Sequence, residues 1–133
     1  MKHYVDTNIF IRYLTKDVID QEKRVKQRLL QAKEGKIQLV LTSFTAVEIL
    51  FILENYYELP KTEAIEKLQS LFSPNFIIID QKEACLEALT LYKDSSIDFV
   101  DLFNFTVAKE DKAKILSFDK DFDKLTPKLR VEP

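Results

Sequence analysis

Short apolar runs alternate with longer helical patterns along the whole chain. The apolar runs predict strands at Lys2–Val5, Ile37–Leu41, Phe76–Ile79 and Ile115–Phe118, with a last one at Leu129–Val131. Helical spacing predicts helices at Ile9–Leu14, Ile19–Gly35, Thr45–Tyr57, Lys61–Phe72, Gln81–Tyr92 and Phe99–Lys109, with a short turn near Phe122. The continuous runs IQLVL and FIII are typical of strands covered on both faces. We therefore expect the α/β class, with a three-layer α/β/α sandwich around a mostly parallel sheet of four or five strands.

Length and composition are those of one globular domain. The chain has 133 residues, of which 46% are hydrophobic and 32% charged, enough to bury a core. It has one glycine and no low-complexity run or repeat that would mark a linker, so residues 1–133 are expected to form a single domain. Asp6 interrupts the first apolar stretch, and no run approaches the roughly 20 apolar residues of a membrane span. We expect a cytoplasmic protein without membrane contact.

The predicted helix in FTAVEILFILENYY is apolar nearly all the way round. If one of its faces meets the sheet, Ile49, Leu53 and Tyr57 still need cover. Another helix of the same chain or a second copy of the chain supplies it, and the second choice predicts a homodimer.

The net charge of −2 gives no overall attraction to nucleic acid, so any such contact has to be local. The segment EKRVKQRLLQAKEGK is rich in lysine and arginine, which is typical of a solvated helix face and also of a helix that contacts phosphates. On the second interpretation the candidate RNA contacts are Arg12, Lys23, Arg24 and Arg28.

Two acids follow predicted strands. Asp6 comes after HYV and Asp119 after ILSF, with Asp121 two residues further on. Both therefore lie at carboxyl ends of strands, the edge at which open parallel sheets bind ligands.

Three further acids lie in helical patterns that are otherwise apolar. Glu48 shares helical spacing with Phe44, Val47, Phe51 and Ile52, which predicts that it points with them toward the core. Asp98 and Asp101 are three residues apart on one face of the next acidic helix, and we expect both to turn away from solvent. Charged side chains are seldom buried without a partner, so these positions call for an explanation.

Each acid also has an ordinary structural interpretation. Thr45-x-x-Glu48 fits a capping box, Asp98 or Ser96 fits a helix N-cap, and Asp101 suits the positive end of a helix dipole. Asp119 and Asp121 fit a turn. Both interpretations stay open for each residue.

A convergence of these carboxylates would require a cation. Like charges close together raise their pKa values or bind a divalent ion, and ligands that are all oxygen suit Mg²⁺ or Mn²⁺. A single histidine, His3, excludes a two-histidine ribonuclease, and a single cysteine, Cys85, excludes a cysteine zinc site. Water is then the expected nucleophile.

The same residues carry a resemblance to a known family. YVDTNIFIRYL, TSFTAVEILFIL, DFVDLFNFTVA and ILSFDKDFDKL resemble, in this order, the four acidic motifs of the PIN-domain family, and within it the VapC-type toxins. The match spans essentially the whole chain. LFNF after the third acid is bulkier than in relatives, which puts the shape of the pocket in doubt.

The resemblance implies a metal-dependent endoribonuclease that leaves a 5′-phosphate and a 3′-hydroxyl. It assigns Asp6, Glu48, Asp101 and Asp119 to catalysis and metal binding, with Asp98 as a further metal-site acid and Asp121 as the rival for the last position. Thr7, Asn8 and Ser117 are auxiliary residues. If the chain is a toxin, its expected partners are RNA and a small antitoxin. The alternatives are an RNA-processing nuclease without antitoxin and a degenerate PIN domain that only binds RNA or protein.

Two other acid-based folds fit poorly. A haloacid-dehalogenase-like phosphatase needs a second acid two residues after the first, where this chain has Asn8. A receiver-like domain wants adjacent acids after its first strand, and none are present.

Overall fold

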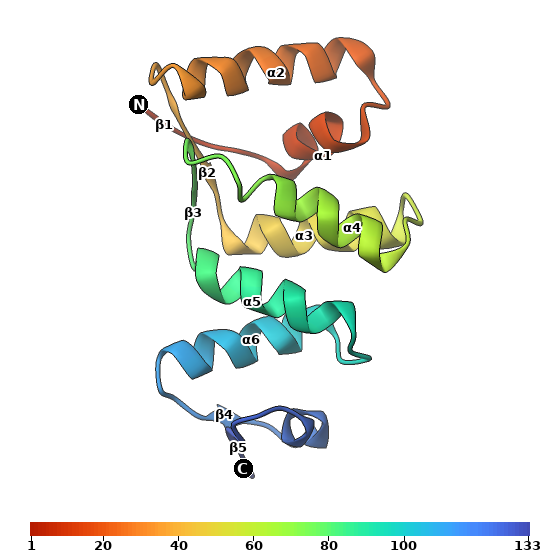
Figure 1. Ribbon diagram of the computed structural model, residues 1–133, viewed down its shortest axis with the longest axis vertical. Helices are drawn as coiled ribbons and strands as arrows, with labels where there is room; N and C mark the ends of the chain where they lie inside the picture. The colour runs from red at the N-terminus through yellow and green to blue at the C-terminus, as the bar shows by residue number, and fades with distance from the viewer. The chain divides into compact units, whose positions relative to one another are not determined.

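The computed structural model describes residues 1–133, which pack as two compact units, Met1–Asp80 and Gln81–Pro133. The elements of the first unit are β1 (Lys2–Tyr4), α1 (Thr7–Thr15), α2 (Ile19–Lys33), β2 (Gln38–Leu41), α3 (Ser43–Asn55), α4 (Lys61–Ser70) and β3 (Ile77–Ile79). Those of the second are α5 (Lys82–Lys93), α6 (Phe99–Glu110), β4 (Ile115–Leu116), the 3₁₀ helix η1 (Lys120–Lys124) and β5 (Arg130–Val131) (Figure 1).

In the first unit β2 is the central strand of a parallel sheet, with β1 and β3 at its edges. Tyr4 pairs with Val40, which pairs in turn with Ile78. Because all three strands run in the same direction, their carboxyl ends meet at one edge of the sheet, and α1 and α3 begin there.

Helices supply most of the core of this unit. Phe10 and Ile11 of α1, together with Ile49 and Leu53 of α3, are at most 1% exposed. Each such side chain contributes about 1.5–3 kcal/mol through burial. α2 ends at Lys33 with Glu34 as its C-cap, and Gly35 follows with the positive φ of 79° that glycine adopts readily after a helix. α1 packs against both α2 and α3, and this packing positions the polar side chains of α1 and α3 that are described below.

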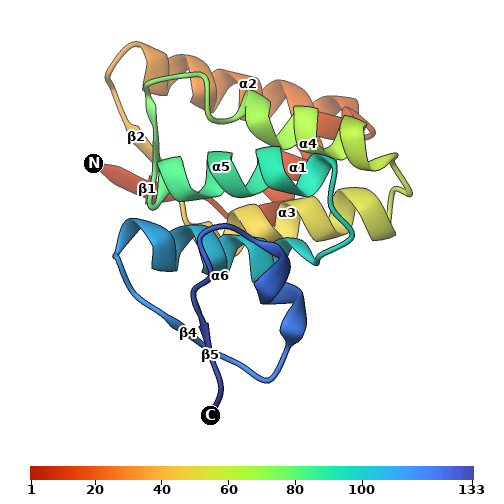
Figure 2. The same cartoon turned by 60° about the horizontal axis from the view of Figure 1, so that its bottom comes forward.

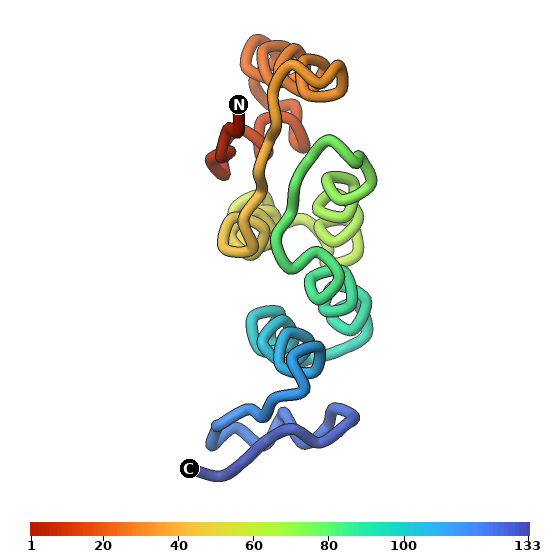
Figure 3. Tube along the Cα trace, turned by 90° about the vertical axis from the view of Figure 1, so that its left-hand side faces the viewer, coloured from red at the N-terminus to blue at the C-terminus, as the bar shows by residue number.

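In the second unit α5 and α6 lie side by side (Figure 2). The Thr106 hydroxyl, fully buried, donates to the Ala84 carbonyl at 2.8 Å and ties the two helices together. After α6 the chain folds back on itself so that β5 lies beside β4 (Figure 3). Phe105, Phe122 and Leu129 form a buried cluster that joins α6, η1 and the approach to β5.

The predicted α/β class with parallel strands is confirmed, and all five predicted strands are present. They form a three-stranded and a two-stranded sheet, however, rather than one sheet of four or five strands. β4 is only two residues long, and its backbone bonds run to the β5 segment, from Ile115 N to Leu129 O at 2.8 Å and from Ser117 N to Val131 O at 3.2 Å. The predicted helices are all found, with ends displaced by a few residues.

The core-facing side of α3 differs from the prediction. Ile49 and Leu53 are fully buried within the single chain, which agrees with the alternative that the same chain covers them, whereas Phe44 is 76% and Phe51 is 65% exposed. A helix that is apolar nearly all round has no periodicity from which to choose the buried face. The surface from which a homodimer was inferred is therefore already covered, and the homodimer remains a prediction without that support.

No helix combines the length and the apolar character that crossing a bilayer requires.

Candidate functional site

Asp6 lies at the carboxyl edge of the three-stranded sheet. Val5 N still donates to Val40 O at 3.0 Å, which extends the pairing of β1, and Asp6 then occupies the N-cap position of α1. An aspartate at this position usually accepts a bond from the first turn of the helix, but the Asp6 side chain makes none and is exposed. Its carboxylate is therefore not committed to holding the fold.

Glu48 is coupled to the same edge through Thr7. Thr7 is 6% exposed, and its hydroxyl donates to Glu48 Oε1, linking the first turn of α1 to α3. The N-cap of α3 is Thr42, which accepts from Thr45 N at 3.2 Å, so Thr45 lies inside the helix. The capping-box interpretation of Thr45 and Glu48 is therefore wrong, and Glu48 is half-buried and oriented by another helix.

A third acid at this edge, Asp80, was not among the predicted residues. It follows β3 and holds the start of α3, accepting from Ser43 N at 2.6 Å and from the Ser43 hydroxyl at 3.2 Å. The run FIIID carries the same signal as HYVD, an acid directly after an apolar strand. Asp80 could therefore have been predicted as a candidate from the sequence. In the structure, however, its carboxylate stabilises the start of α3.

Replacement of Asp80 by alanine is expected to lower the free energy of unfolding by about 1 kcal/mol, because the first turn of α3 loses its side-chain acceptor. The activity of the folded variant should be unchanged. Urea denaturation and an activity assay check the two expectations. A loss of activity larger than the loss of folded protein would contradict the structural role.

The second unit gathers four aspartates around the start of α6. Asp98 is its N-cap residue, makes no cap hydrogen bond and is exposed, so the expectation that it turns away from solvent is wrong. Asp101 is half-buried one turn later. Burial raises the pKa of the Asp101 carboxyl, and the negative charges of Asp119, Asp98 and Asp121 raise it further. Asp101 itself makes no hydrogen bond or ion pair.

Asp119 and Asp121 differ in what their carboxylates do. Asp119 N donates to the Ser117 hydroxyl at 2.9 Å, and Asp119 Oδ1 accepts from Asp121 N at 2.8 Å, so the turn interpretation holds for one of its oxygens. Asp121 forms an ion pair with Lys124 at 2.9 Å. Asp119 Oδ2 has no such partner, and Asp119 is therefore the better candidate for a functional acid.

Arg130 fixes the segment that carries Asp119. Its guanidinium donates to the Ser117 carbonyl at 3.1 Å and to Asp123 Oδ2 at 2.9 Å. The hydrogen bond from Arg130 lowers the pKa of Asp123. Ser117 is thus held from both sides, by its backbone through Arg130 and by its hydroxyl through Asp119 N.

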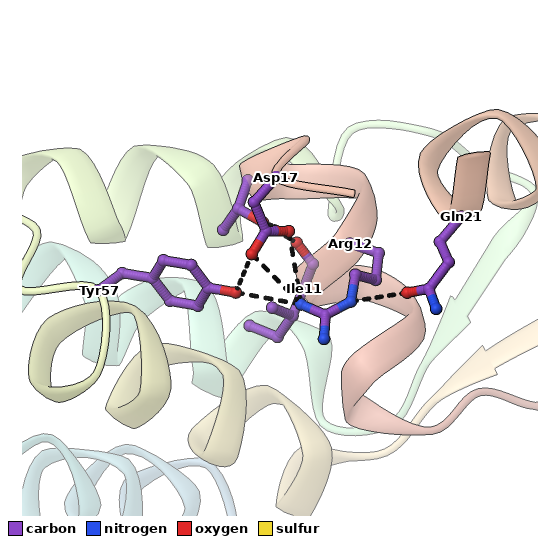
Figure 4. A network of polar contacts seen from close by, with 6 residues as sticks. Ile11, Arg12, Asp17, Gln21 and Tyr57 are labelled. Carbon is purple, nitrogen blue, oxygen red and sulfur yellow. Dashed lines mark hydrogen bonds and ion pairs between the residues drawn. The ribbon is translucent and has the colours of Figure 1, made fainter. Parts of the chain in front are cut away.

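Arg12 of α1 is the centre of a polar network that was not predicted from the sequence (Figure 4). Arg12 Nε donates to Gln21 Oε1 at 2.8 Å and Nη1 to the Tyr57 hydroxyl at 3.2 Å. The Tyr57 hydroxyl donates to Asp17 at 2.8 Å, and this bond lowers the pKa of Asp17. Asp17 therefore stays ionised beside Arg12, 3.4 Å away.

The donors at these places suit a hard divalent cation. All are oxygen atoms. Burial, and after it the negative charges of Asp119, Asp98 and Asp121, raise the pKa of the Asp101 carboxyl, and a divalent ion would offset that negative charge. The structure brings Thr7 to Glu48 in the first unit, and Asp98, Asp119 and Asp121 within electrostatic range of Asp101 in the second. No three His, Cys, Asp or Glu side chains are placed to hold a metal ion together.

Comparison with known proteins identifies the family. No curated protein matches the sequence. The family model described as PIN domain matches residues 3–127, a range that contains every acid discussed above. PIN domains are typically nucleases and generally use divalent metals. The chain therefore belongs to the PIN-domain family.

Proposed function

We propose that the protein is a metal-dependent endoribonuclease that hydrolyses RNA phosphodiester bonds, and that it acts as the toxin of a type II toxin–antitoxin pair. The observation that carries the nuclease proposal is the Asp101 carboxylate, half-buried among three other aspartates and without any cationic partner. A protein that kept this charge only for stability would pair it, since uncompensated like charges destabilise the fold.

The acidic side chains are proposed to have different roles in the reaction. Asp6 and Asp101 are proposed as the principal ligands of Mg²⁺ or Mn²⁺, Glu48 and Asp119 as acids that hold the ion or orient the attacking water, and Asp98 as a supporting acid. A bound ion supplies polarisation of the scissile phosphate and stabilises the leaving oxygen. Thr7 fixes the Glu48 carboxylate, and Ser117 fixes the turn that presents Asp119. Water oxygen then forms the new bond to phosphorus, the bond to the 3′ oxygen breaks, and a proton passes to that oxygen.

Asp6→Asn is the first test. Losing one anionic oxygen at a principal ligand should lower RNA cleavage in Mg²⁺ or Mn²⁺ by more than about a hundredfold, with little change in stability because Asp6 caps nothing. The assay uses pure protein with tRNA and mRNA fragments. Asp20→Asn is the matched control, since Asp20 is an exposed acid on α2 and should leave the rate unchanged.

Two outcomes would contradict the proposal. Cleavage that survives EDTA or Asp6→Asn would mean a contaminant or another mechanism. RNA binding without cleavage, equal in the wild type and in Asp6→Asn, would favour a degenerate PIN domain that only binds RNA.

The toxin role rests on the resemblance of the four acidic motifs to VapC-type proteins. A small antitoxin is proposed to block the acids, with an arginine that replaces the charge of the cation. A short reading frame immediately upstream, whose product relieves growth arrest on co-expression, would support this role. An isolated gene would favour RNA processing without an antitoxin.

Sedimentation of the pure chain tests the predicted homodimer.

A further inference from the structure

A basic pocket lies between α1 and α2 of the first unit. Its volume is about 610 Å³, and it is lined by Arg12, Arg24 and Arg28 together with amide side chains that include Asn8, Gln21 and Gln31. No acidic residue lines it. A pocket walled by guanidinium and amide groups offers many hydrogen-bond donors and a positive potential.

The arginines of α2 keep their charge available. Arg24 makes no hydrogen bond or ion pair, and Arg28 donates only to Gln31, at 3.1 Å. The lysines of the same segment differ, because Lys26 pairs with Glu22 and Lys36 with Glu34, each at 2.8 Å. Lys23 is exposed and does not line the pocket. Three of the four predicted RNA contacts, Arg12, Arg24 and Arg28, therefore line the pocket, and Lys23 does not.

Arg12 is held in place at the α1 side of this pocket. Figure 4 shows its guanidinium between Gln21 and Tyr57, with Asp17 beside it. The hydrogen bonds use Nε and Nη1, and Nη2 has no protein partner. A planar guanidinium that is already oriented suits phosphate oxygens, because little side-chain entropy is lost on binding.

The spacing along α2 also matches a nucleic-acid backbone. Arg24 and Arg28 are one helical turn apart, about 6 Å along the axis, which is similar to the distance between successive phosphates of an extended strand. Asn8, two residues after Asp6, lies at the other side of the pocket. Asn8 therefore connects the pocket to the start of α1, where Asp6 lies.

We propose that the α1–α2 pocket binds the phosphodiester backbone of single-stranded RNA beside the cleaved bond. Arg24 and Arg28 contact successive phosphates, and Arg12 is a further contact fixed by Tyr57 and Asp17. The assignment rests on the proposed nuclease function for its choice of RNA, whereas the chemistry that it uses is that of any phosphodiester chain.

The test measures binding without catalysis. Fluorescence anisotropy of a short fluorescein-labelled single-stranded RNA is followed in EDTA at several salt concentrations, with DNA of the same sequence in a second arm. Arg24→Gln/Arg28→Gln should weaken binding by about tenfold at low salt and reduce the salt slope by about 1.4, since each single-strand phosphate contact contributes about 0.7. RNA and DNA should be affected equally. The control Lys23→Gln should bind nearly as the wild type does.

Three results would overturn the assignment: an unchanged salt slope in the double variant, an equal effect of Lys23→Gln, or displacement of RNA by poly-glutamate as effective as by DNA. The last would mean a pocket for acidic peptides. Thermal unfolding confirms that the variants fold. If the wild type binds RNA with the expected salt slope but never cleaves it in Mg²⁺ or Mn²⁺, the nuclease proposal is contradicted. The proposal that the pocket binds a phosphodiester backbone is then still supported.

Discussion

Asp101→Asn is expected to slow RNA cleavage strongly and at the same time to stabilise the folded chain at neutral pH. The activity should fall by about a hundred- to a thousandfold, because the variant loses the charge that we propose holds the metal ion. The stability should rise, because a neutral amide removes a half-buried charge that Asp98, Asp119 and Asp121 repel. Such a trade of stability against activity is typical of functional sites.

The gain in stability should depend on pH with a definite sign. The pKa of Asp101 is raised in the folded state above its ordinary value of 3.8, so the ionised carboxylate costs stability at every pH above its folded pKa. That cost disappears as the pH falls through the folded pKa toward 3.8. Asp101→Asn should therefore exceed the wild type in Tm at neutral pH and equal it in acid below the unfolded pKa.

The same variant separates metal binding from folding. Mg²⁺ or Mn²⁺ should raise the Tm of the wild type, by the equivalent of about 2.7 kcal/mol at a hundred times the Kd, and should raise that of Asp101→Asn far less. Differential scanning fluorimetry with and without EDTA gives this readout independently of catalysis.

Asp111→Asn is the matched control, since Asp111 is an exposed acid at the other end of α6. Full cleavage by Asp101→Asn, or an equal response of both variants to the metal, would rule out a functional role for the Asp101 charge.

The strands of this fold could be predicted because continuous apolar runs such as IQLVL leave few alternatives. How the strands would be shared between sheets could not, because pairing depends on backbone bonds between distant segments, such as Ile115 N to Leu129 O. The buried face of α3 was likewise hidden, since Phe51 and Leu53 are equally apolar but only Leu53 is buried.

Acidic positions were predictable as unusual, but their individual roles were not. Asp6 and Asp80 follow strands in the same way, yet only Asp80 is committed to a helix start. The partner of Glu48 is Thr7, 41 residues away, and that of Arg12 is Tyr57, 45 residues away. Local spacing contains no information on such contacts, which is why a capping box within α3 was a reasonable but wrong alternative.

Phe105→Ala should be the most destabilising of the substitutions considered. Phe105 is 2% exposed and packs with Phe122 and Leu129, so truncation leaves a cavity and should cost about 3–5 kcal/mol. That is a large fraction of the roughly 5–15 kcal/mol by which a domain is stable. Urea denaturation of the wild type, Phe105→Ala and Phe105→Leu measures the effect, and the leucine variant should lose much less because it fills most of the space.

The loss of packing in Phe105→Ala should also affect the position of Asp119, because the buried cluster anchors the segment that carries this residue. Phe122 belongs to η1, which begins directly after Asp119, and Leu129 precedes β5. Amide hydrogen exchange in residues 112–131 should therefore accelerate in Phe105→Ala more than exchange in β1–β3 does. RNA cleavage per folded molecule should fall with it, whereas Phe105→Leu should retain both protection and activity. Uniform acceleration across the chain, or full activity with an unprotected 112–131 segment, would show that Asp119 needs no such anchor.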